Sequence, residues 1–413
     1  MYLKYFSYGI VLLLMLSAVS SEGCTVFYIS RDGRVLGGSN EDWKDPNTKM
    51  WFYPAGDDHH GWIKFGFAGG FPQAGMNDSG IFWDGTAGPY QDMPFSLENK
   101  EKLSMPLMQK VMEECGSIHE AISIFDGYYC DDQYRGQYLV GGPENTSVII
   151  DGDYLHQNDC SSQVLTNFHR SNPELGGYPC WRYQKASEML DSCSSPTHAL
   201  IGSILSATHQ EGEYPTQYSL IFDPVEKTIF LFYYHNFHEY LELNLNECLS
   251  ADTISYAIPP LFSRTELLYP EQHAEIHADA VVLKWKGLPG SNYEVTLTDE
   301  QGAIAYSEKA TAETDPGNPH QPLYVVLLLL PVLPVLQKKR VYLSVFLIMC
   351  FLICYSCKKE DEIVYTDTRM EFRHSVLNLE AGRTYYWRIT ATPDNTSSFH
   401  TESIAYSFTC TGF

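Results

Sequence analysis

The sequence from Cys24 to Asp42 reads CTVFYISRDGRVLGGSNED. Residues 25–31 alternate in the manner of a β-strand, Gly33 supplies a turn, and residues 35–40 return as the partner strand. The segment therefore predicts a β-hairpin that starts directly after a cysteine and carries acidic residues at the end of its second strand.

Residues 1–23, upstream of this hairpin, have the pattern of a secretory signal peptide. Lys4 precedes the apolar run Gly9–Leu16, and small residues follow it. A membrane helix needs about 20 apolar residues, so this run is too short to be one. We therefore expect cleavage directly before Cys24 and export of the mature protein to the periplasm, the cell surface or the extracellular medium.

The composition is that of a globular protein with a large acidic excess. Of the 413 residues, 44% are apolar and 19% are charged, which allows two ordinary domains or one large one. The formal net charge is −24, and such a field repels a phosphate backbone. Nucleic acid is therefore not an expected partner.

Residues 24–262 read as one α+β unit. Strands are expected at residues 25–31, 35–40, 62–67, 81–84, 138–140, 147–150, 163–165, 218–222 and 228–234. Helices are expected at residues 106–125, with a break at Gly116, and at residues 182–190 and 198–205. This order of strands and helices predicts two sheets sandwiched by helices.

Residues 263–312 and 359–413 have a different sequence pattern, which predicts short strands of alternating polar and apolar residues separated by turns. The segment from Leu379 to Ala391 resembles a late strand of fibronectin type III modules. The two ranges together hold about 105 residues, close to the ~100 of such a sandwich. We therefore expect a second, all-β sandwich domain with an insertion.

The insertion, residues 313–358, is very apolar. It contains two uncharged runs, 323–336 and 341–357, on either side of the basic segment 337–340. Three interpretations stay open: a membrane hairpin with a basic cytoplasmic tip, a single span that uses the later run, or an insertion in a loop of the sandwich. Both runs are shorter than the ~20 residues of a typical span.

A cysteine that becomes the first residue of a protein has special chemistry. Its thiolate can attack a carbonyl carbon while its own α-amino group serves as the base. An α-amine has a pKa of about 7.7–8.0 and a thiol one of about 8.5, so proton transfer between them is nearly isoenergetic. Cys24 therefore needs no histidine partner, no cofactor and no metal.

Several motifs downstream of Cys24 resemble choloylglycine hydrolases and penicillin V acylases. The matching segments are Cys24–Phe27, Gly38–Trp43, Gly75–Ile81, Val164–Asn167 and Trp181–Tyr183. The resemblance covers residues 24–262 and implies an N-terminal-nucleophile hydrolase with an α-β-β-α four-layer sandwich. Isopenicillin acyltransferases and acid ceramidases are relatives of that family.

The resemblance also implies a role for individual residues. Cys24 matches the nucleophile, and Asp42 matches the aspartate that orients the free α-amine. Asn167 matches the asparagine whose amide donates to the oxyanion, and Arg182 matches the arginine beside the nucleophile. A lost oxyanion donor of this type costs about 2.7–4 kcal/mol.

Asn40, Thr86 and Ala87 are expected to contact substrate, with the second oxyanion donor in the backbone of residues 85–87. Ser39 stands where bile salt hydrolases carry an arginine, and the missing cation leaves the sulfur less acidic. This difference argues against bile salts as the substrate without changing the class of reaction.

Two further groups of residues bear on metals and disulfides. Asp57–His60 contains two aspartates and two histidines, but no further ligand stands at a supporting distance, so an exposed loop is expected. Several cysteines can pair in an oxidising compartment or remain buried thiols: Cys115, Cys130, Cys160, Cys180, Cys193 and Cys248.

The sequence therefore predicts an exported cysteine amidohydrolase that cleaves a linear, non-peptide C–N amide bond in a small molecule. An acyltransferase or a secreted dipeptidase would use the same nucleophile. A non-enzymatic adhesion protein is the alternative of another class, and it is favoured by the sandwich domain. Membrane association through residues 323–357 is the remaining partner prediction.

Overall fold

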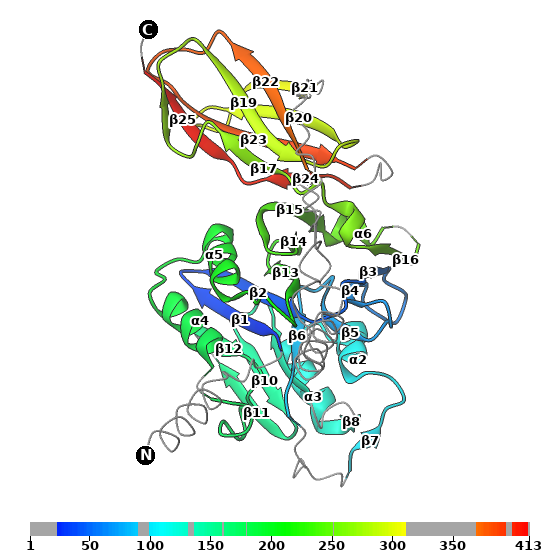
Figure 1. The fold of residues 1–413 in the computed structure, drawn as a ribbon. Helices are drawn as coiled ribbons and strands as arrows, with labels where there is room; N and C mark the ends of the chain where they lie inside the picture. Colours follow the sequence, from blue (N-terminus) through cyan, green and yellow to red (C-terminus); the bar gives the residue numbers. More distant parts are fainter. Residues whose placement is uncertain are drawn as a thin grey trace, which may run out of the picture.

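The structure is a computed structural model, rich in β-sheet and with few helices (Figure 1). It describes residues 23–89, 99–130, 136–158, 161–178, 180–250, 252–310, 369–393 and 399–411. Within these residues no helix is both long enough and apolar enough to cross a bilayer. The predicted signal peptide and both apolar runs of the insertion lie outside the described residues, and these predictions stay open.

The predicted hairpin lies inside the larger sheet. It consists of β1 (Thr25–Arg31) and β2 (Arg34–Asp42), paired antiparallel with Thr25 opposite Asn40. On either side lie β12 (Ser161–Leu165) and β13 (Thr216–Asp223), so no edge of the hairpin is left open. The prediction of a hairpin that begins directly after Cys24 is confirmed.

A second sheet faces the first. Its strand order is β11-β10-β9-β6-β5-β4-β3-β16. The strands in that order are Tyr154–Asn158, Ser147–Asp151, Gly136–Gly141, Phe82–Ala87, Pro72–Asn77, Trp62–Phe67, Thr48–Tyr53 and Ile254–Ala257. Successive side chains of a strand point to opposite faces, and along β1 Val26 and Tyr28 enter the core shared with this second sheet.

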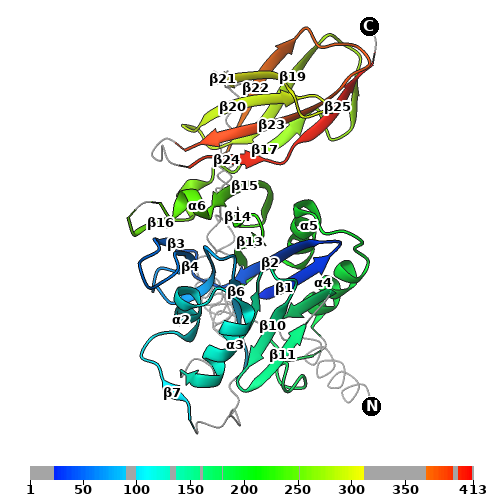
Figure 2. The same ribbon diagram turned by 180° about the vertical axis from the view of Figure 1, so that it is seen from behind.

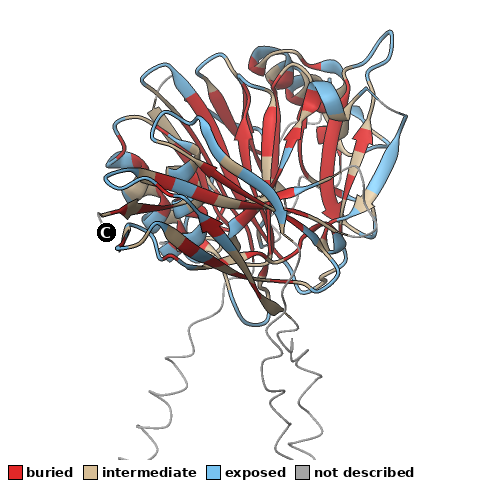
Figure 3. Cartoon of the chain, turned by 90° about the horizontal axis from the view of Figure 1, so that it is seen from above, coloured by how far each residue is buried: buried red, intermediate tan, exposed pale blue. Residues whose placement is uncertain are grey.

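The helices pack on the other faces of the two sheets. Phe27 and Ile29 of β1 contribute to a core with α4 (Trp181–Asp191) and α5 (His198–Thr208). On the second sheet, α2 (Leu107–Glu114) and α3 (Ile118–Gly127) enclose a core that contains Trp62 and Trp83. Figure 3 shows the buried residues along the strands and the exposed ones mainly on loops. The predicted break between helices at Gly116 is confirmed, because Ser117 caps α3 by accepting a hydrogen bond from the backbone of Glu120.

The larger sheet continues beyond the hairpin into the C-terminal part of the chain. Its main path in the described residues is β12-β1-β2-β13-β14-β15-β24-β23-β20-β21. The strands not yet bounded are β14 (Thr228–Tyr233), β15 (Asn236–Asn244), β24 (Thr401–Ser403), β23 (Thr384–Thr392), β20 (Asn292–Thr298) and β21 (Ile304–Ala310). The C-terminal strands form a lobe at one end of the molecule, seen from both sides in Figures 1 and 2.

This C-terminal lobe has a core of its own, centred on Trp285 and Trp387. A three-stranded sheet closes it within the described residues: β17 (Glu266–Tyr269), β19 (Ala280–Gly287) and β22 (Met370–Leu377). The remaining short elements are β7 (Glu101–Lys102), β8 (Tyr128–Tyr129), α6 (Leu245–Cys248), η2 (Pro259–Leu261), β18 (Ala274–Ile276) and β25 (Tyr406–Cys410). The resemblance to fibronectin type III stays a prediction.

The two parts of the chain meet at a buried carboxyl group. Strand β15 pairs with β24, and Glu239 of β15 is fully buried at this junction. It accepts hydrogen bonds from the backbone of Ser263 (3.0 Å) and Thr265 (2.9 Å) and from the hydroxyl of Thr401 (2.6 Å). Burial raises the pKa of Glu239, and these hydrogen bonds lower it. Burial has the larger effect, so the pKa is about 7.

The C-terminal core generates a stability prediction. Trp387 is fully buried, whereas its neighbour Tyr386 is 39% exposed on the same strand. We expect Trp387→Ala to lower the free energy of unfolding by about 3–5 kcal/mol, because it leaves a cavity. The control Tyr386→Ala should cost less than about 1 kcal/mol in the same denaturant titration. Equal losses for the two variants would contradict this assignment of the core.

Candidate functional site

Cys24 lies directly before β1, on the open side of the hairpin. Its side chain is 6% exposed, and its Sγ donates to Oε1 of Glu41 over 3.4 Å. Burial raises the pKa of the Cys24 thiol well above its usual range, and the nearby carboxyls of Glu41, Asp42 and Asp84 raise it further. The thiol is therefore held in its protonated form unless a base lies within reach.

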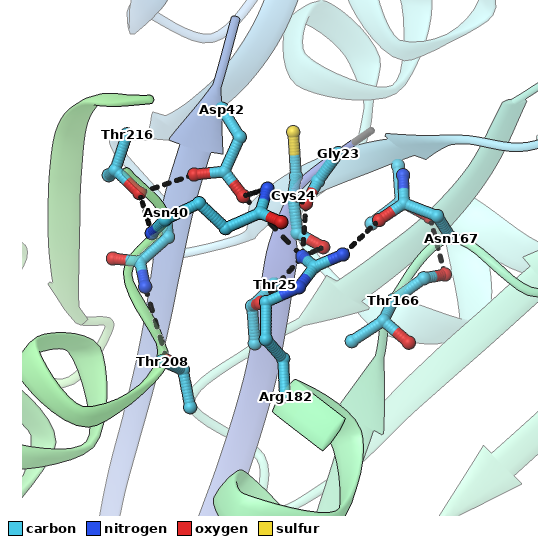
Figure 4. Close-up of polar contacts among 12 residues, drawn as sticks. Gly23, Cys24, Thr25, Asn40, Asp42, Thr166, Asn167, Arg182, Thr208 and Thr216 are labelled. Carbon is cyan, nitrogen blue, oxygen red and sulfur yellow. Dashed lines mark hydrogen bonds and ion pairs between the residues drawn. The ribbon is translucent and has the colours of Figure 1, made fainter. Parts of the chain in front are cut away.

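Arg182 is the central residue of the site (Figure 4). It comes from the first turn of α4 and is fully buried. Its Nη1 donates to the carbonyl of Cys24 (2.8 Å), to Oγ1 of Thr25 (3.0 Å) and to the carbonyl of Gly23. One guanidinium thus fixes the backbone on both sides of the cysteine.

The same guanidinium reaches two further side chains. Nη1 lies 3.4 Å from Oδ2 of Asp42, and Nη2 donates to Oδ1 of Asn167 over 3.0 Å. The four predicted catalytic residues, Cys24, Asp42, Asn167 and Arg182, therefore lie together although they come from distant parts of the sequence. A planar fork of donors is what allows one side chain to hold several acceptors at once.

Asp42 ends β2 and is buried. It accepts hydrogen bonds from Nε2 of Gln210 (2.7 Å) and from the hydroxyl of Thr216. Burial raises the pKa of Asp42 to about 7, while Arg182 and these two donors lower it. The carboxyl therefore titrates near neutrality, where a small change in its surroundings alters its charge.

The amide of Asn167 has one orientation, because each end has a defined partner. Oδ1 accepts from Arg182, and Nδ2 donates to the carbonyl of Ala87 over 2.5 Å. A Cβ atom at Gly23 would lie 1.7 Å from this Nδ2, so the residue before Cys24 occupies the space in front of the amide. Removal of that residue would open a donor site beside the sulfur.

Sequence reasoning missed a pair of buried acids beneath the cysteine. Glu41 is 2% exposed, and Asp84, on β6, is fully buried, with Ser39 and the backbone of Gly85 as its polar neighbours. Burial raises the pKa of each carboxyl well above its usual range, which favours the protonated forms. Asp84 and Asp42 raise the pKa of Glu41 further, and Asp42 raises that of Asp84. The sequence feature that could have indicated a buried acid is the position of Asp84 directly after the aromatic residues Phe82 and Trp83 in a predicted strand.

The three residues expected to contact substrate, Asn40, Thr86 and Ala87, differ from one another in their surroundings. The Nδ2 of Asn40 donates to the carbonyl of Leu205 (3.0 Å) and to Oγ1 of Thr208 (3.1 Å), both on α5. Thr86 is buried and donates to the carbonyl of Thr166 over 3.1 Å. Ala87 is exposed at the margin of the site, where its carbonyl accepts from Asn167.

Other residues singled out in the sequence lie outside this site. Asp57–His59 is exposed, as expected for a loop, and His60 bonds instead to Asp78 over 2.7 Å. The thiols of Cys115, Cys180, Cys193 and Cys248 are free in the structure. These four residues are therefore unpaired thiols, the second of the two alternatives that the sequence leaves open for them.

Two hydrolases are among the solved structures to which the chain shows a distant similarity. No family profile matches the chain, and no curated protein matches its sequence. The chain is similar to the penicillin V acylase from Agrobacterium tumefaciens, with 18% identity and a TM-score of 0.41 over 51% of this chain and 82% of that one. It is also similar to a mutant of the conjugated bile acid hydrolase from Clostridium perfringens, with 14% identity and a TM-score of 0.46 over 57% and 97%. These are the enzyme types that residues 24–262 resemble in sequence, and the function proposed below rests on the site itself.

The Arg182–Asp42 pair generates a stability prediction. In Arg182→Met the Asp42 carboxylate loses its buried cation, so we expect a loss of about 3–5 kcal/mol at pH 8. The loss should be smaller at pH 5, because the Asp42 pKa of about 7 leaves this carboxyl protonated there. Chemical denaturation at the two pH values measures the difference.

The matched control is the same change in an Asp42→Asn background. Since asparagine does not titrate, the extra cost of Arg182→Met at pH 8 should disappear in that background. A pH-independent loss in both backgrounds would show that the ion pair with Asp42 contributes nothing to the loss.

Proposed function

We propose that the protein is an N-terminal-nucleophile cysteine amidohydrolase whose mature form begins at Cys24. It is exported and cleaves a linear, non-peptide C–N amide bond in a small molecule. Residues 24–262 form the catalytic domain, an α-β-β-α four-layer sandwich. Residues 263–312 and 359–413 form a fibronectin type III-like domain, and the insertion 313–358 is a candidate membrane contact.

The observation that carries the proposal is the contact set of Arg182. This side chain binds the carbonyl of Cys24 and reaches Asp42 and Asn167. Gly23, the residue before the cysteine, contacts Arg182 and Asn167 as well. A cysteine that is only structural would not require a buried cation, a buried acid and an oriented amide around its own backbone. An N-terminal nucleophile can use all three: the acid would hold the α-amine, the amide would donate to the oxyanion, and the cation would position both.

The identity of the base follows from the surroundings of the sulfur. The Cys24 thiol has a raised pKa, and burial also raises the pKa of its hydrogen-bond partner Glu41, so this carboxyl is a poor base for the thiol. Cleavage before Cys24 would create an α-amine close to this sulfur, with a pKa of about 7.7–8.0. Asp42 lies beside this position and, when ionised, would hold the amine toward the sulfur.

The reaction then has three steps. The α-amine takes the proton of the thiol, and Sγ forms a bond to the carbonyl carbon of the substrate. Nδ2 of Asn167, together with a backbone N–H near Ala87, donates to the oxyanion. The α-ammonium returns its proton to the leaving nitrogen as the C–N bond breaks, and water then hydrolyses the thioester and releases the acid.

Acyl transfer to an amine would use the same first step with a different acceptor. Ala87, whose carbonyl accepts a hydrogen bond from Asn167, is exposed, and through this margin an amine would compete with water for the thioester. Product analysis with and without added amines distinguishes hydrolysis from transfer. A preference for substrates with a free N-terminus would instead indicate a dipeptidase.

The nucleophile prediction combines processing with activity. N-terminal sequencing of the active form should start at Cys24, and Cys24→Ala should abolish hydrolysis of a panel of N-acyl amides and N-acyl amino acids. The control Cys248→Ala, a half-buried free thiol on α6, should keep full activity. An active enzyme that retains Gly23, or an active Cys24→Ala variant, would sink the proposal.

The role of Asn167 has a separate signature. We expect Asn167→Ala to lower kcat by about 10²–10³-fold, the effect of losing one oxyanion donor, with a much smaller change in KM. The protein should still be processed and folded. A change in KM alone would assign Asn167 to binding of the ground state.

The pH profile reports the state of Asp42. Because Asp42 must be ionised to hold the α-ammonium, kcat/KM should rise with pH through the pKa of this carboxyl. That pKa is about 7 with Gly23 attached, and the free amine adds a cation that lowers it, so the limb should lie at or below pH 7. In Asp42→Asn the residual activity should lose this limb and keep the one set by the neutral α-amine, near its own pKa of about 7.7–8.0.

A further inference from the structure

Three potential metal ligands, His209, Glu211 and His235, lie together beside the proposed catalytic site. His209 and Glu211 come from the loop after α5, and His235 comes from the turn between β14 and β15. One ligand atom from each residue lies within 4.8 Å of the others, and Nε2 of His209 is 3.5 Å from Oε1 of Glu211. The two imidazole centroids are 4.7 Å apart.

The hydrogen bonding of His209 leaves one nitrogen available as a ligand. Nδ1 lies 2.6 Å from the carbonyl oxygen of Ser206, which can only accept, so Nδ1 carries the proton. Nε2 therefore has a free lone pair when the ring is neutral, and it faces Glu211. A ligand histidine that donates its other N–H to a backbone carbonyl is the usual arrangement at metal sites.

His235 has the complementary feature. Its Nε2 is buried and makes no hydrogen bond of ordinary geometry among the residues that the structure describes, although backbone groups of Gln210 and Thr216 lie near the ring. An unsatisfied buried polar atom costs about 1–3 kcal/mol. A metal ion would satisfy this nitrogen.

The backbone at this turn is strained. Tyr234 and His235 have φ values of 42° and 62°, in the left-handed region that favours glycine and asparagine. Strain of this kind persists where the surrounding structure requires it and is frequent at functional sites. His235 also lines an open hollow of about 360 Å³.

We propose that His209, Glu211 and His235 form a binding site for a divalent transition metal of the zinc type. Two imidazoles and one carboxylate are the ligands that Zn²⁺ prefers, whereas Ca²⁺ and Mg²⁺ require mainly oxygen. Zn–N bonds are about 2.0–2.1 Å long, so the three ligand atoms must draw together slightly. Glu211, whose side chain is 80% exposed, can make most of this movement, and water fills the fourth position.

The site is linked to the catalytic residues through Gln210, which lies between two of the ligands in the sequence. Nε2 of Gln210 donates to Oδ2 of Asp42 (2.7 Å) and to the carbonyl of Gly23 (3.1 Å). A metal bound on both sides of Gln210 would fix this loop and hence its hydrogen bond to Asp42. Metal binding therefore orders the residue that positions the acid of the proposed reaction.

Binding is tested with cobalt, whose visible absorption reports coordination by these ligands. The protein is purified without a histidine tag and carries Cys24→Ala, so that the proposed nucleophile cannot bind the metal. We expect one Co²⁺ per chain with a tetrahedral absorption band, and displacement by Zn²⁺. The readout does not depend on enzymatic activity, so it remains valid if the proposed function fails.

Ligand variants decide the assignment. Glu211→Gln, which is exposed and should not disturb folding, and His235→Ala should each weaken Co²⁺ binding at least tenfold. His238→Ala, on the same hairpin and exposed, is the matched control and should bind as the parent does. Absence of the tetrahedral band, or equal binding by the parent and the two ligand variants, overturns the proposal.

Discussion

One buried guanidinium holds the catalytic part of the chain together. Arg182 of α4 contacts the carbonyl of Cys24, the carboxyl of Asp42 and the amide of Asn167, which lie at the ends of three different strands. A buried cation is tolerated only when its donors are met by acceptors, and here strand ends from the same sheet supply them. The sheet therefore fixes the position of the arginine, and the arginine fixes the reacting groups.

The site is unusual in its charge. Around the sulfur lie Glu41, Asp42 and Asp84, and Ser39 is buried on the same strand as Glu41 and Asp42. Burial without a cation drives Glu41 and Asp84 toward their neutral forms, so the field at the sulfur is weaker than the number of carboxyl groups implies. In the proposed reaction, deprotonation of the thiol depends on the α-amine that cleavage before Cys24 would create.

The sequence predicted the parts of this arrangement that depend on local patterns. The hairpin followed from alternation and Gly33, and the break between α2 and α3 followed from Gly116, because turns and caps are short-range signals. Strands β3, β5 and β15 were missed. The buried state of Asp84 was missed too, since it is set by a partner strand and helices far away in the sequence. His209 and His235 likewise have no motif spacing, and only the fold brings them together.

The junction between β15 and β24 has a consequence for how the chain can be divided. The two lobes share backbone hydrogen bonds, not merely a flexible connection, because β24 covers the middle of β15 at Glu239–Leu241. A truncated first lobe would leave this segment as an uncovered strand margin with unpaired N–H and C=O groups, which is a template for aggregation. By covering this strand, the C-terminal lobe prevents the first lobe from pairing with other chains at β15.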